Sequence, residues 1–191
     1  MKYLLVIIVF LFSFIGILFQ NEVKWTPNEK LKWSDFKKKL STGANELALL
    51  DGGIKSDFEQ KKDSTVSVVI YAFYDKNLSS KSEDINALTE RGLKHEQGHF
   101  DIWEWYARVL RKKLIDTTLI KFNQTTAIFN LVYKEANNVE DRYDKETNHS
   151  NDTTAQRKWE ALIKQKLDEY SGYSNTEFQI YIKKRNKIKS Q

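Results

Sequence analysis

Residues 95–108 read "HEQGHFDIWEWYAR" and carry two histidines four positions apart, with a glutamate directly after the first. On an α-helix, side chains four positions apart lie on one face, about one turn from each other. The imidazoles of His95 and His99 can therefore reach one metal ion, while Glu96 lies near enough to contact a water on that metal. This H-E-x-x-H pattern predicts a zinc site with an acid–base carboxylate, although so short a pattern also arises by chance.

The residues around this motif predict one long helix. Ser80 followed by Glu83 fits a capping box, so the helix is expected to begin there and to end at about Leu114. In steps of 100° per residue, both histidines fall on the apolar stripe and face other elements of the domain. The stripe consists of Leu88, His95, His99, Ile102, Trp103, Tyr106 and Leu110.

Two further features of this helix concern the site. Gly92 lies one turn before His95, and its missing side chain is expected to leave room for a substrate or a neighbouring strand. Glu104 and Arg108 fall on the face opposite the histidines, where they are expected to form a modestly stabilising i,i+4 ion pair. Glu104 is therefore a poor candidate for a metal ligand.

A catalytic zinc site needs three protein ligands and one open position. The chain has no cysteine and only three histidines, so the third ligand is expected to be the remaining histidine or a carboxylate. His149 is the leading candidate, because the helix expected between it and His99 allows the chain to fold back. The rival candidates are Glu135, Glu140 and Asp144.

Upstream of the motif helix, the sequence predicts an antiparallel hairpin. Residues 65–74, "TVSVVIYAFY", are β-branched and aromatic, which favours a strand. Residues 46–59 are its expected partner, with a turn or bulge at 51–53, and residues 60–64 are the connecting turn. The strand at 65–74 is also expected to bind an extended peptide substrate along its edge.

Two more helices are expected after the motif helix. One covers residues 125–138 and is followed by a polar loop at 141–152. The last helix is expected to start at Thr153, with Gln156 as its capping-box partner, and to end at about Tyr170. Two strands followed by three helices make an α+β fold.

The composition and charge limit the class of partner. The chain is 40% apolar and 13% aromatic, which indicates a folded globule. Its net charge is +5, and residues 183–189 alone contain five lysines and arginines without an acid. The remainder is near neutral, so we expect no nucleic-acid partner. The tail is expected to be a solvated terminus, with contact to anionic lipid or cell-wall polymer as the alternative.

The N-terminal stretch predicts export. Residues 3–19, "YLLVIIVFLFSFIGILF", hold no charge and follow Met1-Lys2, which indicates a signal peptide or a membrane anchor. The run is at the lower limit for crossing a bilayer, which takes about 20 residues. An exported chain without cysteine is more typical of bacteria than of disulfide-stapled eukaryotic proteins.

The chain resembles a bacterial family of predicted secreted zinc-dependent proteases, catalogued largely as a domain of unknown function. The resemblance rests on "LKWSDF" (31–36), on the strand ending "VIYAF" (69–73), and on "HEQGHFDI" (95–102) with Glu104 and Ala107-Arg108. A late motif, Tyr143-Asp144-x-x-Thr147-x-His149 followed by Gln156 and Trp159, completes it. The late motif departs from the family pattern at Ser150, where glycine is expected. The resemblance covers about residues 30–165 and implies export, a zincin-like site and peptidase chemistry.

The late motif also brings Tyr143 into consideration. A tyrosine near the metal can donate a hydrogen bond to a developing oxyanion, and the alternative is a packed loop aromatic. Thr147 and Asp144 are expected either to orient His149 or to serve as turn residues.

The sequence thus predicts a bacterial zinc metallopeptidase that is exported or tethered to the membrane through residues 3–19. In it His95, His99 and His149 bind Zn²⁺, Glu96 is the general base and Tyr143 is a second catalytic candidate. Its expected partner is a peptide or protein substrate, including peptidoglycan peptides. The alternatives are a cell-wall peptide amidase with the same ligands, and a non-catalytic surface protein whose structural zinc is closed by an acid such as Asp144.

The expected organisation has three parts. A signal peptide or membrane anchor covers residues 1–20, a zincin-like domain covers 21–175, and a basic tail covers 176–191. Within the domain, an antiparallel hairpin or small sheet precedes the motif helix and the two further helices.

Overall fold

The computed structural model describes residues 21–40, 47–62, 64–119 and 121–183. The strands are β1 (Glu22–Lys24), β2 (Lys38–Lys39), β3 (Ala48–Leu49), β4 (Gly52–Gln60), β5 (Thr65–Asp75), β6 (Ser80–Lys81) and β7 (Glu177–Tyr181). The helices are α2 (Glu90–Asp116), α3 (Gln124–Thr147) and α4 (Thr153–Glu169), with 3₁₀ turns η1 (Trp33–Asp35), η2 (Ile85–Ala87) and η3 (Ser171–Tyr173). The fold is α+β, as the sequence predicts. The apolar run at 3–19 lies outside the described residues, and none of the described helices is long and apolar enough to cross a bilayer.

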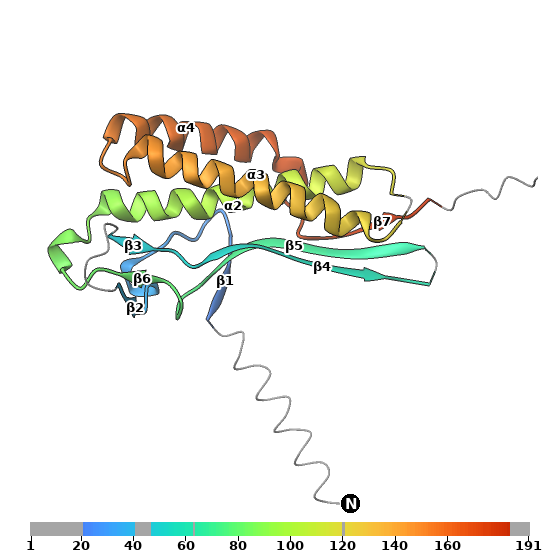
Figure 1. The fold of residues 1–191 in the computed structure, drawn as a ribbon, viewed down its shortest axis with the longest axis horizontal. Helices are drawn as coiled ribbons and strands as arrows, with labels where there is room; N and C mark the ends of the chain where they lie inside the picture. The colour runs from blue at the N-terminus through green and yellow to red at the C-terminus, as the bar shows by residue number, and fades with distance from the viewer. Residues whose placement is uncertain (1–20, 41–46, 63, 120, 184–191) are drawn as a thin grey trace, which may run out of the picture.

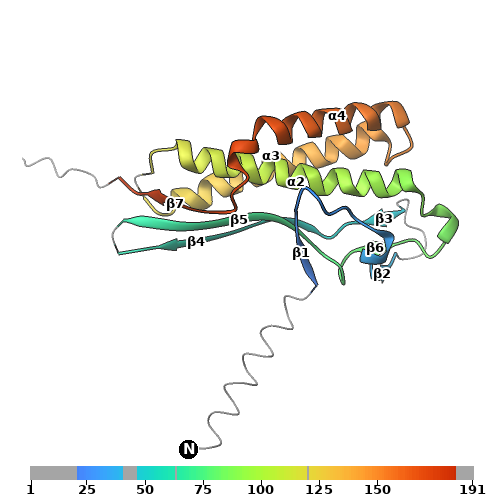
Figure 2. The same cartoon turned by 180° about the vertical axis from the view of Figure 1, so that it is seen from behind.

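Three layers make up the domain (Figure 1). A four-stranded antiparallel sheet lies at the base, α2 lies along it, and α3 and α4 cover α2 from the other side. The view from behind shows the same order of layers (Figure 2). A second, small sheet with strand order β2-β6-β3 lies beside the N-terminal half of α2. That half carries the two motif histidines.

The expected hairpin is confirmed as β4 and β5, which pair antiparallel from Gly52↔Tyr74 to Gln60↔Val66. Alternate residues of β5 are buried under the helices, as expected for a strand with one face on the core. However, β5 is not an edge: β4 pairs with it on one side, and β1 and β7 pair with its two ends on the other. The expectation that strand 65–74 binds a peptide along its edge is therefore wrong.

The motif helix begins later than the sequence predicts. Ser80 lies in β6, where it pairs with both neighbouring strands, so the capping box of Ser80 and Glu83 does not form. Instead Thr89 caps α2, and its Oγ1 accepts a hydrogen bond from the backbone N–H of Gly92 at 3.1 Å. The loop and η2 between β6 and Thr89 bring the chain from the small sheet to the top of the large one.

The expected loop at 141–152 is mostly helix. Helix α3 continues to Thr147, and only five residues separate it from α4. Asn148, His149 and Ser150 take left-handed φ angles of 47°, 48° and 71°. This conformation raises the free energy of residues other than glycine, so contacts with the rest of the domain must stabilise the turn. Glycine at position 150 would avoid the cost at that position.

Helix α4 starts at Thr153, as predicted, but Asp152 caps it. The Asp152 carboxylate accepts from the N–H groups of Thr154 and Ala155, so Gln156 is not needed as a capping partner. After α4 the chain returns to the sheet, where β7 pairs with residues 65–69 of β5. This strand lies beyond the boundary at 175 that the sequence predicts for the domain, and within the expected basic tail.

Helix α2 is buried on both sides, because the sheet lies under one face and α3 and α4 lie over the other. Glu104 and Arg108 pair as expected, with 2.8 Å between Arg108 Nε and Glu104 Oε1, but both are buried rather than exposed. Arg111, which is fully buried, joins the same carboxylate. Between α2, α3 and α4 lies a second apolar cluster, which consists of Ile102, Trp105, Tyr143, Trp159 and Ile163.

Candidate metal centre

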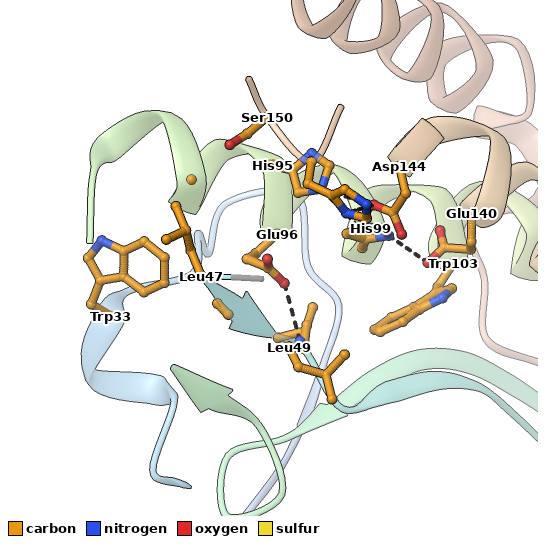
Figure 3. A pocket seen from close by; sticks show the side chains of 14 residues that line it. Trp33, Leu47, Leu49, His95, Glu96, His99, Trp103, Glu140, Asp144 and Ser150 are labelled. Carbon is orange, nitrogen blue, oxygen red and sulfur yellow. Dashed lines mark hydrogen bonds and ion pairs between the residues drawn. The ribbon is translucent and has the colours of Figure 1, made fainter. Parts of the chain in front are cut away.

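The histidines of α2 face a cavity of about 250 Å³ between the N-terminal half of α2, the end of α3 and β3 (Figure 3). Residues 47–50 form one wall, and the turn with His149 and Ser150 forms another. Glu96 projects into the same cavity. The helical spacing of the motif thus places three chemically active side chains in one cavity.

The two motif histidines converge on one point. Their Nε2 atoms lie 3.3 Å apart, although the residues are one helical turn from each other. The ring planes are close to perpendicular, at 87°. Two nitrogens that converge in this way are arranged as a bidentate site for one cation.

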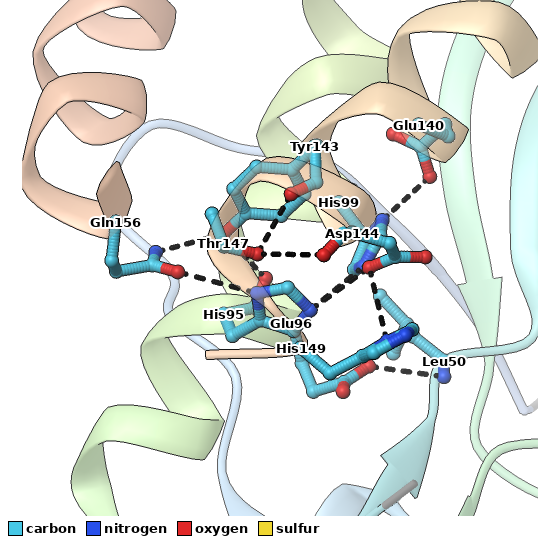
Figure 4. A network of polar contacts seen from close by, with 10 residues as sticks. All are labelled: Leu50, His95, Glu96, His99, Glu140, Tyr143, Asp144, Thr147, His149 and Gln156. Atoms are coloured by element: carbon cyan, nitrogen blue, oxygen red, sulfur yellow. Dashed lines mark hydrogen bonds and ion pairs between the residues drawn. The ribbon is translucent and has the colours of Figure 1, made fainter. Parts of the chain in front are cut away.

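Each histidine is held from behind by an acceptor on another helix (Figure 4). The Nδ1 of His95 lies 3.2 Å from Gln156 Oε1 on α4, and the Nδ1 of His99 lies 2.8 Å from Glu140 Oε2 on α3. Such partners on the far ring nitrogen fix the tautomer and the orientation of metal-binding histidines. The sequence gives His95 and His99, but it does not indicate these two partners.

A chain of hydrogen bonds sets the orientation of Gln156. The Tyr143 hydroxyl donates to the backbone carbonyl of His95 at 3.1 Å, and it accepts from Gln156 Nε2 at 2.8 Å. With its amide nitrogen turned to Tyr143, Gln156 presents its oxygen to His95. Gln156 Oε1 is therefore placed to accept a hydrogen bond from the His95 Nδ1.

Tyr143 takes the second of its two expected roles, that of a packed aromatic, although it lies on a helix rather than in a loop. Its side chain is fully buried, and its ring stacks on that of His95 at 4.6 Å between centroids. Its hydroxyl is used by the two contacts just described and does not line the cavity. The expectation that Tyr143 stabilises an oxyanion is wrong, and Tyr143 instead positions His95.

A glycine inside the motif permits this packing. A β-carbon on Gly98 would lie 2.2 Å from the Tyr143 hydroxyl and 2.6 Å from its Cζ. Only glycine therefore allows α3 to come this close to α2. Gly92, in contrast, lines the cavity, and a β-carbon there would meet Trp33 at an ordinary contact distance of 3.5 Å.

The other polar residues of the motif anchor the N-terminal segment. Gln97 accepts from the backbone N–H of Leu31 and donates to Asp101, which also accepts from Trp25 Nε1 at 2.7 Å. These bonds hold the segment before η1 against α2. Leu31 and Phe36 then bury their side chains in the core.

Glu96 is a buried carboxylate with one fixed oxygen. Its Oε2 accepts a hydrogen bond from the backbone N–H of Leu50 at 3.2 Å. Burial raises the pKa of Glu96 above its usual value, against the opposing effect of the two histidines. A raised pKa brings a carboxylate nearer to the range in which it exchanges protons at neutral pH.

Three of the four candidates for the third ligand lie at the site. The Asp144 Oδ1 is 3.0 Å from His95 Nε2 and 2.9 Å from His99 Nε2. His149 lies farther out, with its Nδ1 3.8 Å from the same oxygen, and His95, Asp144 and His149 offer ligand atoms within 4.8 Å of one another. Glu140 backs His99, and its Oε1 is buried without a hydrogen-bond partner among the described residues. Glu135 pairs with Lys113 and takes no part.

The charges at the site favour a cation. Burial raises the pKa of Asp144, but its bonds to His95 and His99 outweigh this and hold the pKa well below the usual range. Burial alone would lower the pKa of His99, but Glu140 and Asp144 hold it well above its usual value. The carboxylates of Glu96, Glu140 and Asp144 thus surround two imidazoles, and positive charge at the centre is stabilised.

The sequence names candidate residues between 140 and 147 but misses the extension of α3 that carries them. Glu140, Tyr143, Asp144 and Thr147 follow helical i,i+3 and i,i+4 spacing and so share one face of α3. The polar composition of 141–152 indicates a loop and hides that face. The four-residue spacing of Glu140 and Asp144 is the signal that would have revealed it.

Comparisons with known proteins are consistent with the family resemblance only at a coarse level. No curated protein and no solved structure matches the chain significantly. Residues 62–150, from the turn before β5 to the turn after α3, match the family described as "Bacterial protein of unknown function (DUF922)".

Proposed function

We propose that the protein is a zinc-dependent hydrolase of zincin type that cleaves peptide bonds. The observation that carries the proposal is the convergence of His95 and His99 Nε2 at 3.3 Å, with each Nδ1 held from behind and Glu96 in the same cavity. Surface histidines or ordinary core histidines do not require this convergence.

The donor set fits zinc. Nε2 of His95, Nε2 of His99 and Oδ1 of Asp144 lie 2.9–3.3 Å apart. A proton on a histidine Nε2 can bridge to Asp144, and a metal ion in the place of that proton would be held by the same three atoms. Imidazole nitrogen and carboxylate oxygen are zinc ligands, and the chain has no cysteine to offer. When bound, the metal would supply a Lewis acid that polarises the substrate carbonyl and lowers the pKa of water.

Glu96 is the proton carrier in this proposal. Water adds its oxygen to the peptide carbonyl carbon, and Glu96 takes the proton that water loses. The C–N bond then breaks, and Glu96 passes the proton to the leaving amine, so that the carboxylate is regenerated. Burial and the bond from the Leu50 N–H hold Glu96 in place for both transfers.

Strand β3 is the edge at which an extended peptide can pair. The Ser82 N–H bonds the Leu47 carbonyl, so in the antiparallel pairing of β3 and β6 the backbone groups of Ala48 and Leu50 point away from β6. The Leu50 N–H accordingly bonds Glu96. We propose that Ala48 N–H and C=O bind the substrate backbone beside Glu96, by strand addition.

The decisive test is a comparison of the full chain with Glu96→Gln, both purified in mild detergent. We expect about one zinc per chain in each, and release of peptides from labelled casein only by the parent. The proposal would be contradicted if the purified parent contained no zinc, or if the variant hydrolysed casein as fast as the parent. Purified peptidoglycan as the substrate tests the amidase alternative with the same two proteins.

We also propose that the chain is exported or held at the membrane through residues 3–19. Fractionation of a bacterium that expresses the full chain tests this point separately, and recovery in the cytosol would refute it.

A further inference from the structure

Two residues near the end of α3, Asp144 and His149, compete for the place of third ligand. We propose that Asp144 is the third protein ligand of the metal and that His149 instead faces the substrate. This inference rests on the proposed function, and it reverses the order of preference that the sequence suggests.

The distances favour Asp144. Ligand atoms at about 2.0–2.1 Å from a tetrahedral zinc are about 3.3 Å from one another. The triangle of His95 Nε2, His99 Nε2 and Asp144 Oδ1 has sides of 3.3, 3.0 and 2.9 Å. Small shifts of these three atoms would give the spacing of ligands around one zinc ion. His149 Nδ1, in contrast, is 3.8 Å from Asp144 Oδ1, and the ligand atoms of His95, Asp144 and His149 are spread over as much as 4.8 Å.

The backbone also favours Asp144. Asp144 lies within the last turn of α3, next to Tyr143, which packs on His95. Its position relative to α2 is therefore set by a tightly packed helix contact. His149 lies outside the helix, in a turn of three left-handed residues. A helix holds a ligand more rigidly than a short loop does.

The exposure of His149 suits contact with a substrate. Its side chain is 47% exposed, against 6% for His95 and 13% for His99, and it lines the cavity from the turn after α3 (Figure 4). The 3.8 Å separation from Asp144 is longer than a hydrogen bond, so its ring nitrogens are not committed to that carboxylate. A ring N–H of His149 can then donate to the carbonyl oxygen of the scissile bond, where negative charge develops. This is the role that the buried Tyr143 cannot fill.

The test separates metal binding from turnover. Zinc affinity of the full chain is measured by competition with a chromophoric chelator for the parent, Asp144→Asn and His149→Ala. We expect Asp144→Asn to bind zinc at least 100-fold more weakly, and His149→Ala to bind it within about threefold of the parent. On labelled casein, His149→Ala should lower kcat by about 10²–10³-fold, the loss typical of one oxyanion donor. Asp141→Asn, an exposed neighbour one turn earlier, is the matched control and should change neither.

X-ray absorption of the zinc-loaded parent supplies a second readout that does not depend on how the variants fold. Two imidazole ligands support the assignment, and three overturn it. Equal loss of zinc in the two variants would also overturn it. The zinc affinities identify the third ligand even if casein is not cleaved. In that case the proposed peptidase function fails, but the assignment of Asp144 as a ligand is still supported. A parent that binds no zinc would overturn both.

Discussion

At the scale of single residues, Gly98 controls how closely α3 approaches the motif histidines. A methyl group at this position would meet the fully buried ring of Tyr143, with 2.2 Å to the hydroxyl. We predict that Gly98→Ala lowers the free energy of unfolding by about 1–3 kcal/mol, the usual cost of overpacking. Urea unfolding of the full chain measures it. Zinc affinity should fall as well, because Tyr143 positions both His95 and Gln156.

Gly92→Ala is the matched control for this prediction. Both glycines lie in α2, but the β-carbon at position 92 meets Trp33 at 3.5 Å, which is ordinary contact. Alanine is the better helix former by about 1 kcal/mol, so this variant should be as stable as the parent or more stable. Equal stability of the two variants would show that Tyr143 can move away from position 98.

At the scale of elements, strand β3 links the small sheet to the proposed chemistry. Ala48 begins the strand, and its N–H points away from β6, so Ala48→Pro removes a backbone donor on the cavity side without breaking the pairing. We predict that kcat/KM for peptides falls about tenfold, mainly through KM, while zinc content stays the same. Steady-state kinetics on a defined peptide check this.

Leu49→Pro provides the contrast within the same strand. The N–H of Leu49 faces β6, where the residue pairs with Ser80, so proline there should lower stability instead. If Ala48→Pro left KM unchanged in a folded, zinc-loaded protein, strand addition at β3 would be ruled out.

Helix α3 shows why an element can be longer than its sequence suggests. Its N-terminal part has an apolar stripe, but its last turns present Glu140, Asp144 and Thr147 inward. There the helix is stabilised by buried polar contacts to the histidines rather than by an apolar face. The pattern of apolar residues, which is the main signal for a helix, is therefore missing in these turns.

At the scale of the whole molecule, Arg111 ties the three layers together. This fully buried side chain, on α2, donates to the Ile70 carbonyl of β5, to the Glu104 carboxylate and to the Tyr173 carbonyl after α4. We predict that Arg111→Met destabilises the domain by about 3–5 kcal/mol, because it leaves Glu104 partly unpaired in the interior. Thermal or urea unfolding measures the change.

The adjacent Lys112 is the matched control. It forms an exposed i,i+4 ion pair with Asp116, and such pairs add little to stability. Lys112→Met should leave the free energy of unfolding nearly unchanged. A similar loss in the two variants would mean that the Arg111 network is not what connects the layers.

The sequence by itself determined the features that depend on local periodicity. The alternation in 65–74 predicted the central strand, and the spacing of His95, Glu96 and His99 predicted a helix that turns its histidines inward. These signals are local, because the periodicity of a helix or a strand can be read from residues that are close together in the sequence. The α+β class followed from the order of those elements.

Tertiary structure decided everything that joins distant segments. The partners of His95 and His99, the burial of Tyr143, the nearness of Asp144 and the edge at β3 involve residues 40 or more positions from the motif. They arise because α3 and α4 cover α2 and because Gly98 lets α3 approach. The sequence offers the polar side chains for these contacts, but only packing in three layers selects which of them meet the histidines.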